Sequence, residues 1–89
     1  MAKSLRSPRQ RQLLELLVKT RRSRGLTQAS LAAKLGKPQS FVAKVENGER
    51  RLDVIEFIEL ALAMKARPVD LISRLESAPA SKRKVTKEG

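Results

Sequence analysis

The stretch spanning residues 25–50 constrains the fold more than any other part of the chain. If Gln28 is counted as position one, small or apolar residues follow at positions five, nine, fifteen and eighteen, namely Ala32, Gly36, Val42 and Val45. A small residue allows two helices to cross closely, and glycine suits a turn with positive φ. Two apolar residues three apart lie on one helix face. This spacing predicts two short helices joined at Gly36.

The first helix has a boundary signal at each end. Ser7 caps the first helix, Pro8 takes its first position, and Gln10 can complete a capping box. The helix should end near Arg24, because Gly25 offers a left-handed stop. An apolar stripe at helical spacing consists of Leu13, Leu14, Leu17 and Val18.

The second and third helices have their own boundary signals. Thr27 caps a helix that reaches about Leu35, with Leu31, Ala32 and Leu35 facing inward. Pro38 then opens a helix over 38–47, and Gly48 ends it.

Two more helices follow. Asp53 and Glu56 form a capping box, with Leu52 and Phe57 as its hydrophobic staple. We expect the fourth helix to bury Phe57, Ile58, Ala61, Leu62 and Met64. Pro68 starts a short fifth helix that carries Val69, Leu71, Ile72 and Leu75. The chain should therefore be an all-α, five-helix domain over 7–76, with a flexible basic arm at 1–6 and a disordered basic tail at 77–89.

The charge is large and unevenly distributed. The 89 residues include 20 Lys and Arg against 9 Asp and Glu, a net charge of +11. Residues 1–24 hold 8 basic and 1 acidic residue and residues 25–51 hold 5 and 2, whereas residues 52–75 hold 3 and 4. The positive charge therefore gathers on the first three helices, which indicates a polyanionic partner.

Composition also excludes several function classes. The chain has no cysteine and no histidine, so a zinc finger, a thiol nucleophile and an imidazole base are excluded. Its carboxylates show no convincing catalytic pairing, so we expect no enzyme, no metal and no cofactor. No apolar stretch approaches the ~20 residues of a membrane span, and no signal-peptide core follows the basic start. We therefore expect a cytoplasmic, nucleoid-associated protein without a membrane partner.

From about Gln12 to Leu75 the chain resembles the Cro and phage-repressor type of helix-turn-helix regulators, the XRE family. The resemblance is carried by the spacing from Gln28 to Val45 and by the flanking ALAMKARPVDLI segment. It implies a lambda-repressor-like fold that places the third helix in the DNA major groove.

The third helix supplies the expected base-reading residues. With Val42 and Val45 inward, the opposite face holds Ser40, Ala43, Lys44 and Asn47, and Gln39 lies in the first turn. Glutamine can bond to adenine and lysine to guanine. In the resembling repressors, the positions of Gln39, Ser40 and Lys44 read bases. Phe41 could press on a thymine methyl or extend the core beside Phe57.

Other residues are expected to hold phosphates or to support the fold. The family resemblance implies a phosphate clamp at Gln28, and we expect further backbone contacts at Lys37, Asn47, Arg50 and Arg51. Glu49 departs from the family pattern, in which a basic residue is common there. Arg21 and Glu46 match a structural ion pair of similar repressors. Helix five offers dimer-interface candidates at Val69, Leu71, Ile72 and Leu75.

The resulting hypothesis is a sequence-specific, double-stranded-DNA-binding repressor that acts as a homodimer on a near-palindromic operator. One alternative is the antitoxin and autorepressor of a toxin–antitoxin pair, with a toxin protein as partner, or a controller of a restriction system. Another is a sequence-neutral nucleic-acid packager. The two aromatic residues offer no β-sheet platform for stacking bases, which weighs against the packager.

Overall fold

The computed structural model describes residues 7–77 and contains five helices in that range. They are α1 (Pro8–Ser23), α2 (Gln28–Leu35), α3 (Gln39–Glu46), α4 (Val54–Ala63) and α5 (Pro68–Glu76). The expected all-α, five-helix fold is confirmed. The arm predicted at 1–6 and the tail predicted from 77, except Ser77 itself, lie outside the described residues.

Side-chain caps fix where the helices begin. Thr27 and Ser30 form a full capping box at α2, and Asp53 and Glu56 form the expected one at α4. Each box satisfies backbone N–H groups that have no partner inside the helix. At α1 the Ser7 hydroxyl accepts from the Gln10 backbone N–H at 3.1 Å, which is the Ser7 half of the expected box.

The turn between α2 and α3 depends on a left-handed residue. Gly36 ends α2 with φ 70° and ψ 30°, and its N–H donates back to the Ala33 carbonyl. Glycine adopts this conformation without the steric cost that a Cβ would add. Pro38 is extended and lies just before α3, so the helix runs from Gln39 to Glu46 and is one residue shorter at each end than predicted.

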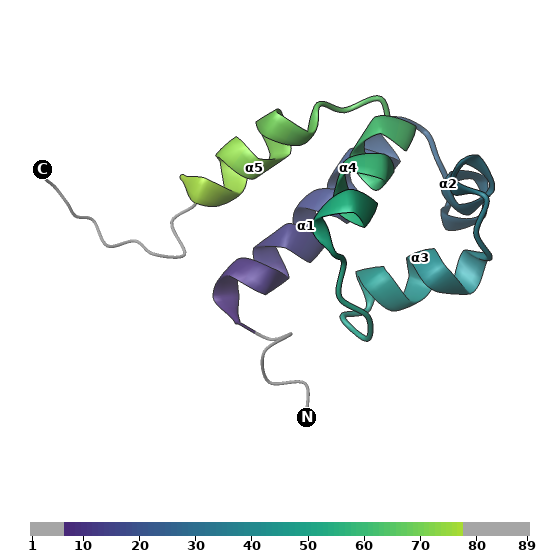
Figure 1. Cartoon of the computed structure of the whole chain (residues 1–89), viewed down its shortest axis with the longest axis horizontal. Coiled ribbons are helices and arrows are strands. Elements are labelled where there is room, and N and C mark those ends of the chain that lie inside the picture. Colours follow the sequence, from purple (N-terminus) through teal and green to yellow (C-terminus); the bar gives the residue numbers. More distant parts are fainter. Residues whose placement is uncertain (1–6, 78–89) are drawn as a thin grey trace, which may run out of the picture.

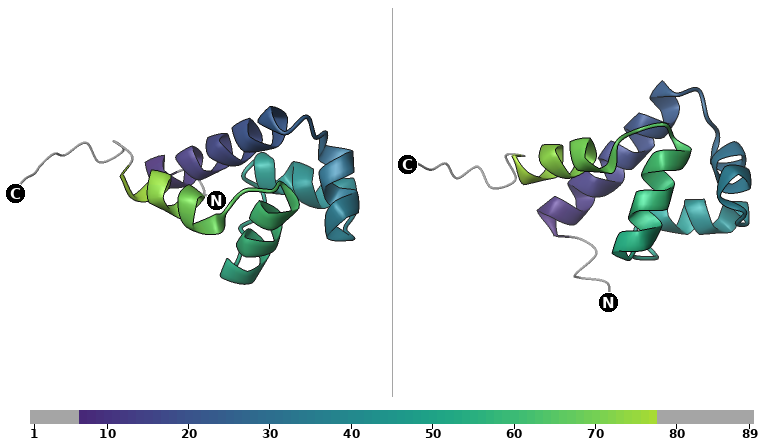
Figure 2. Two further views of the ribbon diagram at one scale, coloured as in Figure 1. Left: turned by 90° about the horizontal axis from the view of Figure 1, so that it is seen from above. Right: turned by 45° about the horizontal axis from the view of Figure 1, so that its top comes forward.

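Side chains from all five helices meet in one core. Its buried apolar members are Leu17, Leu31, Ala32, Val42, Val45, Phe57, Leu60, Ala61, Met64, Ala66 and Leu71. In Figure 1, α2 and α3 lie at one end of the molecule, with α4 between them and α5. Both views of Figure 2 show α5 lying against α1, away from α3. This arrangement leaves one face of α3 open to solvent.

The prediction that Leu62 is buried in α4 is wrong, because this residue is 58% exposed. Phe57, Leu60, Ala61 and Met64 form a stripe at helical spacing, and all four are buried. Leu62 lies five positions after Phe57, which is roughly 140° around a helix. The core-facing stripe is therefore narrower than the apolar sequence suggested.

Candidate nucleic-acid interface

The outward face of α3 is set by its two valines. Val42 and Val45 are each only 1% exposed and anchor the helix to the core. The three polar residues predicted to read bases, Gln39, Ser40 and Lys44, are all exposed. The fold thus brings a glutamine, a serine and a lysine onto one accessible helix, which is a set of side chains able to bond base edges.

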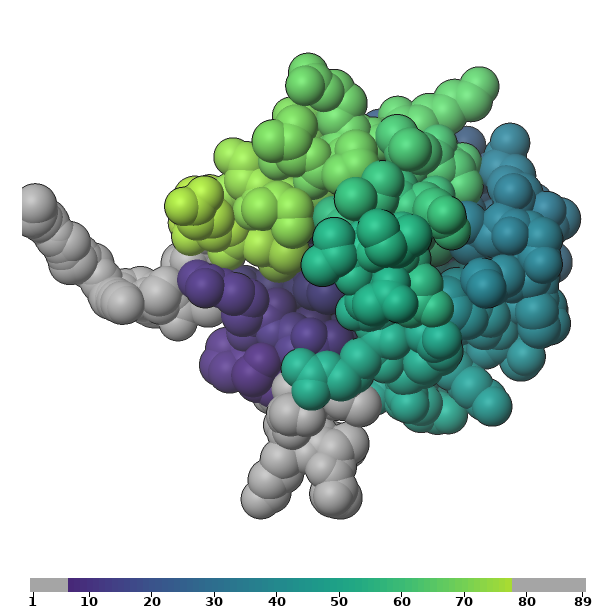
Figure 3. Space-filling view, viewed as in Figure 1, coloured from purple at the N-terminus to yellow at the C-terminus, as the bar shows by residue number. Residues whose placement is uncertain are grey.

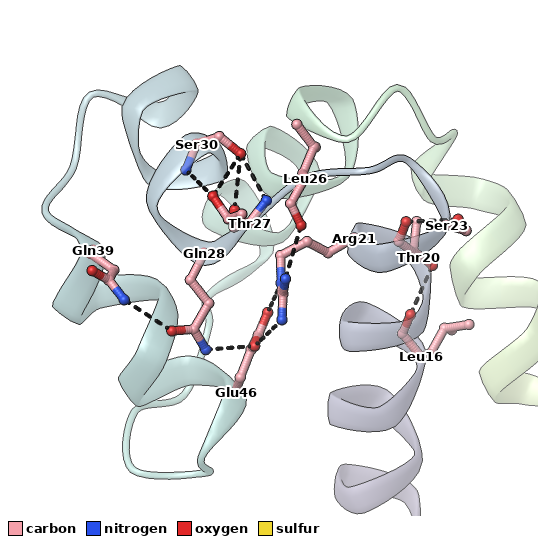
Figure 4. Close-up of polar contacts among 10 residues, drawn as sticks. All are labelled: Leu16, Thr20, Arg21, Ser23, Leu26, Thr27, Gln28, Ser30, Gln39 and Glu46. Carbon is pink, nitrogen blue, oxygen red and sulfur yellow. Dashed lines mark hydrogen bonds and ion pairs between the residues drawn. The ribbon is translucent and has the colours of Figure 1, made fainter.

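A chain of polar contacts joins this face to the interior, as Figure 4 shows. The Gln39 side-chain Nε2 donates to Gln28 Oε1 at 3.3 Å, and Gln28 Nε2 donates to Glu46 Oε1 at 2.8 Å. Gln28 lies in the first turn of α2, beside the N-terminal end of α3. The predicted phosphate-clamp residue and the predicted base-reading residue are therefore in direct contact.

Glu46 also pairs with α1. Arg21 Nε donates to Glu46 Oε2 at 2.7 Å, and Arg21 Nη2 donates to Glu46 Oε1 at 3.0 Å. Arg21 Nη1 donates to the Leu26 carbonyl at 2.9 Å, and the two charged side chains are 9% and 8% exposed. Two parallel bonds at such burial fix the relative orientation of the two helices. This pair therefore sets the angle of α3 against α1.

Phe41 has a mixed environment. It is partly buried against the core, and the Lys37 ammonium and Arg50 guanidinium lie over its ring at 5.1 Å and 4.8 Å from the centroid. Cations at these distances are attracted to the ring quadrupole. Phe41 thus holds two basic side chains beside the N-terminal half of α3.

Arg50, one of the predicted phosphate-binding residues, forms an ion pair within the protein. Its Nη1 and Nη2 donate to Glu56 Oε1 and Oε2, each at 2.9 Å. Hydrogen bonding from Arg50, with a further bond from the Asp53 backbone, lowers the pKa of Glu56 to about 2. The guanidinium therefore ties the α3–α4 segment to the first turn of α4, and the phosphate contact predicted for Arg50 stays a prediction.

The remaining predicted phosphate-binding residues lie at the two ends of α3. Lys37 precedes the helix, Asn47 is its exposed C-cap, and Arg51 is exposed in the segment that follows. Glu49 is exposed in the same segment. Basic or polar groups therefore lie at both ends of the predicted base-reading face, with one acidic residue among them.

A separate apolar groove lies between α4 and α5. Figure 3 views the face on which these two helices lie side by side. The α4–α5 groove is lined by Leu13, Leu52, Asp53, Val54, Phe57, Ile58, Pro68, Val69, Ile72 and Leu75. Among the predicted dimer residues, Val69 and Ile72 are 56% and 49% exposed, but Leu71 is 4% exposed. Leu71 belongs to the monomer core and cannot serve as an interface residue.

Several contacts were not predicted from the sequence. Among them are the Gln28–Glu46 bond and the bond in which Arg24 Nε donates to the Met64 carbonyl at 3.0 Å. The first had a partial signal, since Gln28 and Glu46 were each singled out as site residues, although not as partners. The second had none, because its acceptor is a backbone carbonyl forty residues away.

Among residues 7–77 no helix is long and apolar enough to cross a membrane. Within the same range no cluster of three or more potential metal-ligating side chains was found.

Comparisons with known proteins agree with this geometry. A family model described as helix-turn-helix matches residues 17–72. A protein of Sinorhizobium fredii, described as an uncharacterized HTH-type transcriptional regulator, is 36% identical over 59 residues, which cover 66% of this chain and 77% of that protein. A solved structure of an XRE-family like protein from Pseudomonas syringae pathovar tomato is 49% identical with a TM-score of 0.79, covering 84% of this chain and 92% of that one.

Proposed function

Because this chain belongs to the XRE family of helix-turn-helix transcriptional regulators, a family that binds double-stranded DNA, we propose that it is a sequence-specific repressor. In this proposal α3 enters the major groove and α2 spans the phosphates. The protein acts on the DNA of the nucleoid, in the cytoplasm. Neither a cofactor nor a metal takes part.

The observation that carries the proposal is the exposed polar face of α3. Its valines are buried, and Gln39, Ser40 and Lys44 project from a short helix whose N-terminal end is open. The N-terminal part of a recognition helix is the part that reaches base edges. We assign base reading to these three residues. Phe41 stands at the flank of this face, where its ring holds Lys37 and is placed to press on a thymine methyl.

Phosphate contacts would position this face on the duplex. The proposed phosphate-binding residues lie at the start of α2 or near the two ends of α3, and they are Gln28, Lys37, Asn47, Arg50 and Arg51. Such contacts give affinity and register without sequence information. Their loss should therefore weaken binding to all duplexes alike.

We further propose that the protein acts as a homodimer through the α4–α5 groove. Val69 and Ile72 are exposed there, partly buried Leu75 lies beside them, and Val54 at the start of α4 is 71% exposed. Covering apolar surface of this kind favours association. A two-fold dimer would place its recognition helices about 34 Å apart, which requires a near-palindromic operator.

A salt titration tests the proposal. Binding of a selected operator and of a scrambled duplex is measured across salt concentrations, with single- and double-stranded RNA as further competitors. We expect affinity to fall by orders of magnitude between low and moderate salt if about six or more phosphates are contacted. The operator should stay the tighter ligand throughout. Equal affinity for operator and scrambled duplex would instead support the nucleic-acid packager.

A further inference from the structure

A second concentration of positive charge lies in a cavity lined by α1 with its C-cap, by α5, and by the segment 64–67 that joins α4 to α5. This α1–α5 cavity has a volume of about 400 Å³. The charged residues of its lining are Lys19, Arg24, Lys65, Arg67, Asp70 and Arg74. We propose that the α1–α5 cavity is a binding site for a small ligand that carries two or more phosphate groups.

The cations of the second half of the domain are gathered at this cavity. Residues 52–75 hold three basic and four acidic residues, and all three basic ones line the cavity, whereas one acidic residue does. Together with Lys19 and Arg24, five basic residues against one acidic residue leave the lining with a net charge of +4. A phosphate monoester carries at most about −2, so a ligand needs at least two phosphate groups to balance this charge.

Four of the five cations have no counter-charge inside the protein. Among residues 7–77, the side chains of Lys19, Lys65, Arg67 and Arg74 form no ion pair with an acidic side chain. Like charges that are not paired repel one another, and an anion placed among them removes this repulsion. All four side chains are exposed, so salt should screen the attraction and weaken binding.

Arg24 differs from the other four because its guanidinium is already held in place. Its Nε donates to the Met64 carbonyl at 3.0 Å, its Nη1 to Ser23 Oγ at 3.1 Å, and its Nη2 to the Lys65 carbonyl at 3.5 Å. A guanidinium has five N–H groups, so two remain for a ligand. Arg24 therefore offers a phosphate a fixed cation, and little side-chain freedom is lost when the phosphate binds.

The buried part of the lining favours a small ligand over a nucleic acid. Thr20, Ala66 and Leu71 line the cavity and are only 8%, 9% and 4% exposed. The volume falls within the range of about 300 to 1,000 Å³ that is usual for small-molecule sites. A DNA duplex is a convex rod that can touch only the rim of such a recess.

The cavity is also separate from the proposed DNA interface. Both views of Figure 2 show α5 against α1 and away from α3. None of the predicted base-reading or phosphate-binding residues lines the cavity. Ligand binding here is therefore a property beyond the proposed function, and it can be tested without DNA.

The test titrates inorganic tripolyphosphate at low salt into the full-length protein while backbone amide resonances are followed by NMR. The largest shifts should fall at residues 19–24 and 65–71, and they should saturate with one Kd of about 1 mM or tighter. ATP, titrated in the same way, separates two sources of the phosphate groups. Tighter binding of ATP than of tripolyphosphate assigns the site to a nucleotide, and equal or weaker binding of ATP assigns it to a free oligophosphate.

Three variants connect the binding to the cavity charges, and all of the substituted side chains are exposed. Arg67→Gln with Arg74→Gln removes two cavity cations and should raise the Kd for tripolyphosphate by about fivefold or more. The matched control, Arg22→Gln with Lys34→Gln, removes the same charge outside the cavity and should change the Kd by less than about twofold. Asp70→Asn removes the opposing charge and should lower the Kd by about twofold or more.

Two results would overturn the proposed site. One is a set of shifts confined to residues outside the cavity, above all to α3, because the phosphate chain would then bind at the proposed DNA interface. The other is an equal loss of affinity in the cavity variant and in the matched control. That loss would show that tripolyphosphate responds to the net charge of the protein and not to the α1–α5 cavity. Circular dichroism establishes that each variant is folded before its Kd is compared.

Discussion

Arg50 and Glu56 form a two-point ion pair that ties the segment between α3 and α4 to the start of α4. The Nη1 and Nη2 atoms of Arg50 each lie 2.9 Å from a Glu56 carboxylate oxygen. Glu56 Oε1 also accepts from the Asp53 backbone N–H at 3.0 Å, so one carboxylate caps α4 and holds the preceding segment. Stability in this region therefore depends on the charge of Glu56.

Acid should weaken this contact. The pKa of Glu56 falls from an ordinary 4.5 to about 2 in the folded protein, so its stabilising contribution is complete above about pH 5 and is lost as the pH falls toward 2. We expect the melting temperature of the unsubstituted protein to exceed that of Glu56→Gln above pH 5, and the difference to shrink between pH 5 and pH 2. A difference that stays constant down to pH 2 would show that the charge of Glu56 does not matter.

Breaking the Arg21–Glu46 pair should cost more. Arg21→Ala or Glu46→Ala leaves the other charge buried between helices, which we expect to destabilise the fold by about 3 kcal/mol and to lower the melting temperature by more than about 10 °C. Thermal unfolding followed by circular dichroism measures this. The double variant Arg21→Met with Glu46→Leu is the control and should recover most of the loss. Single variants that melt like the original protein would identify the pair as free surface charges.

Backbone conformation predicts a matched pair of opposite effects. Gly36→Ala adds a Cβ at a residue with φ 70°. No atom lies within 4 Å of that Cβ, so the variant should lose only the free energy of the left-handed strain, about 1 kcal/mol of stability. Lys65 has φ 59° and is not glycine, so Lys65→Gly should relieve similar strain. Urea unfolding should show a lower midpoint for the first variant and an unchanged or higher one for the second. A reversed order would rule out backbone strain as the cause.

The proposed dimer surface can be tested with a single charge. Ile72→Lys places an ammonium group in the α4–α5 groove. The control Leu62→Lys replaces an apolar residue of similar exposure that lies outside that groove. Burying an unpaired charge is unfavourable, so only Ile72→Lys should sediment as a monomer and bind a palindromic duplex more weakly. If both variants associate like the unsubstituted protein, the interface lies elsewhere or the protein is a monomer.

Local signals were enough to predict most of the fold. Thr27 and Gly36 marked the ends of α2 because capping and left-handed turns are local properties of the chain. Val42 and Val45 fixed the inward face of α3, since helix geometry then determines which residues face out. The exposure of Ser40 and Lys44 follows from those two valines, and Gln39 was placed by its position in the first turn of the helix.

Long-range choices were harder to predict. Arg50 has a long side chain that can turn toward a phosphate or toward Glu56, and helical periodicity does not decide between them. Leu71 and Ile72 are adjacent and both apolar, yet only Leu71 is buried, because the docking angle of α5 against α1 and α4 determines which one meets the core. The spacing of apolar residues in the sequence does not determine that docking angle.

If the exposed face of α3 reads DNA sequence, lysine variants should differ in their binding to duplexes that carry single-base substitutions. At one salt concentration, Lys44→Ala should lose about 1 to 3 kcal/mol of binding on the preferred duplex and lose its discrimination at one base pair. Lys65→Ala removes the same charge from the turn after α4 and should leave every base preference unchanged. If Lys44→Ala and Lys65→Ala keep identical sequence preferences, Lys44 does not read a base and α3 is not the recognition helix.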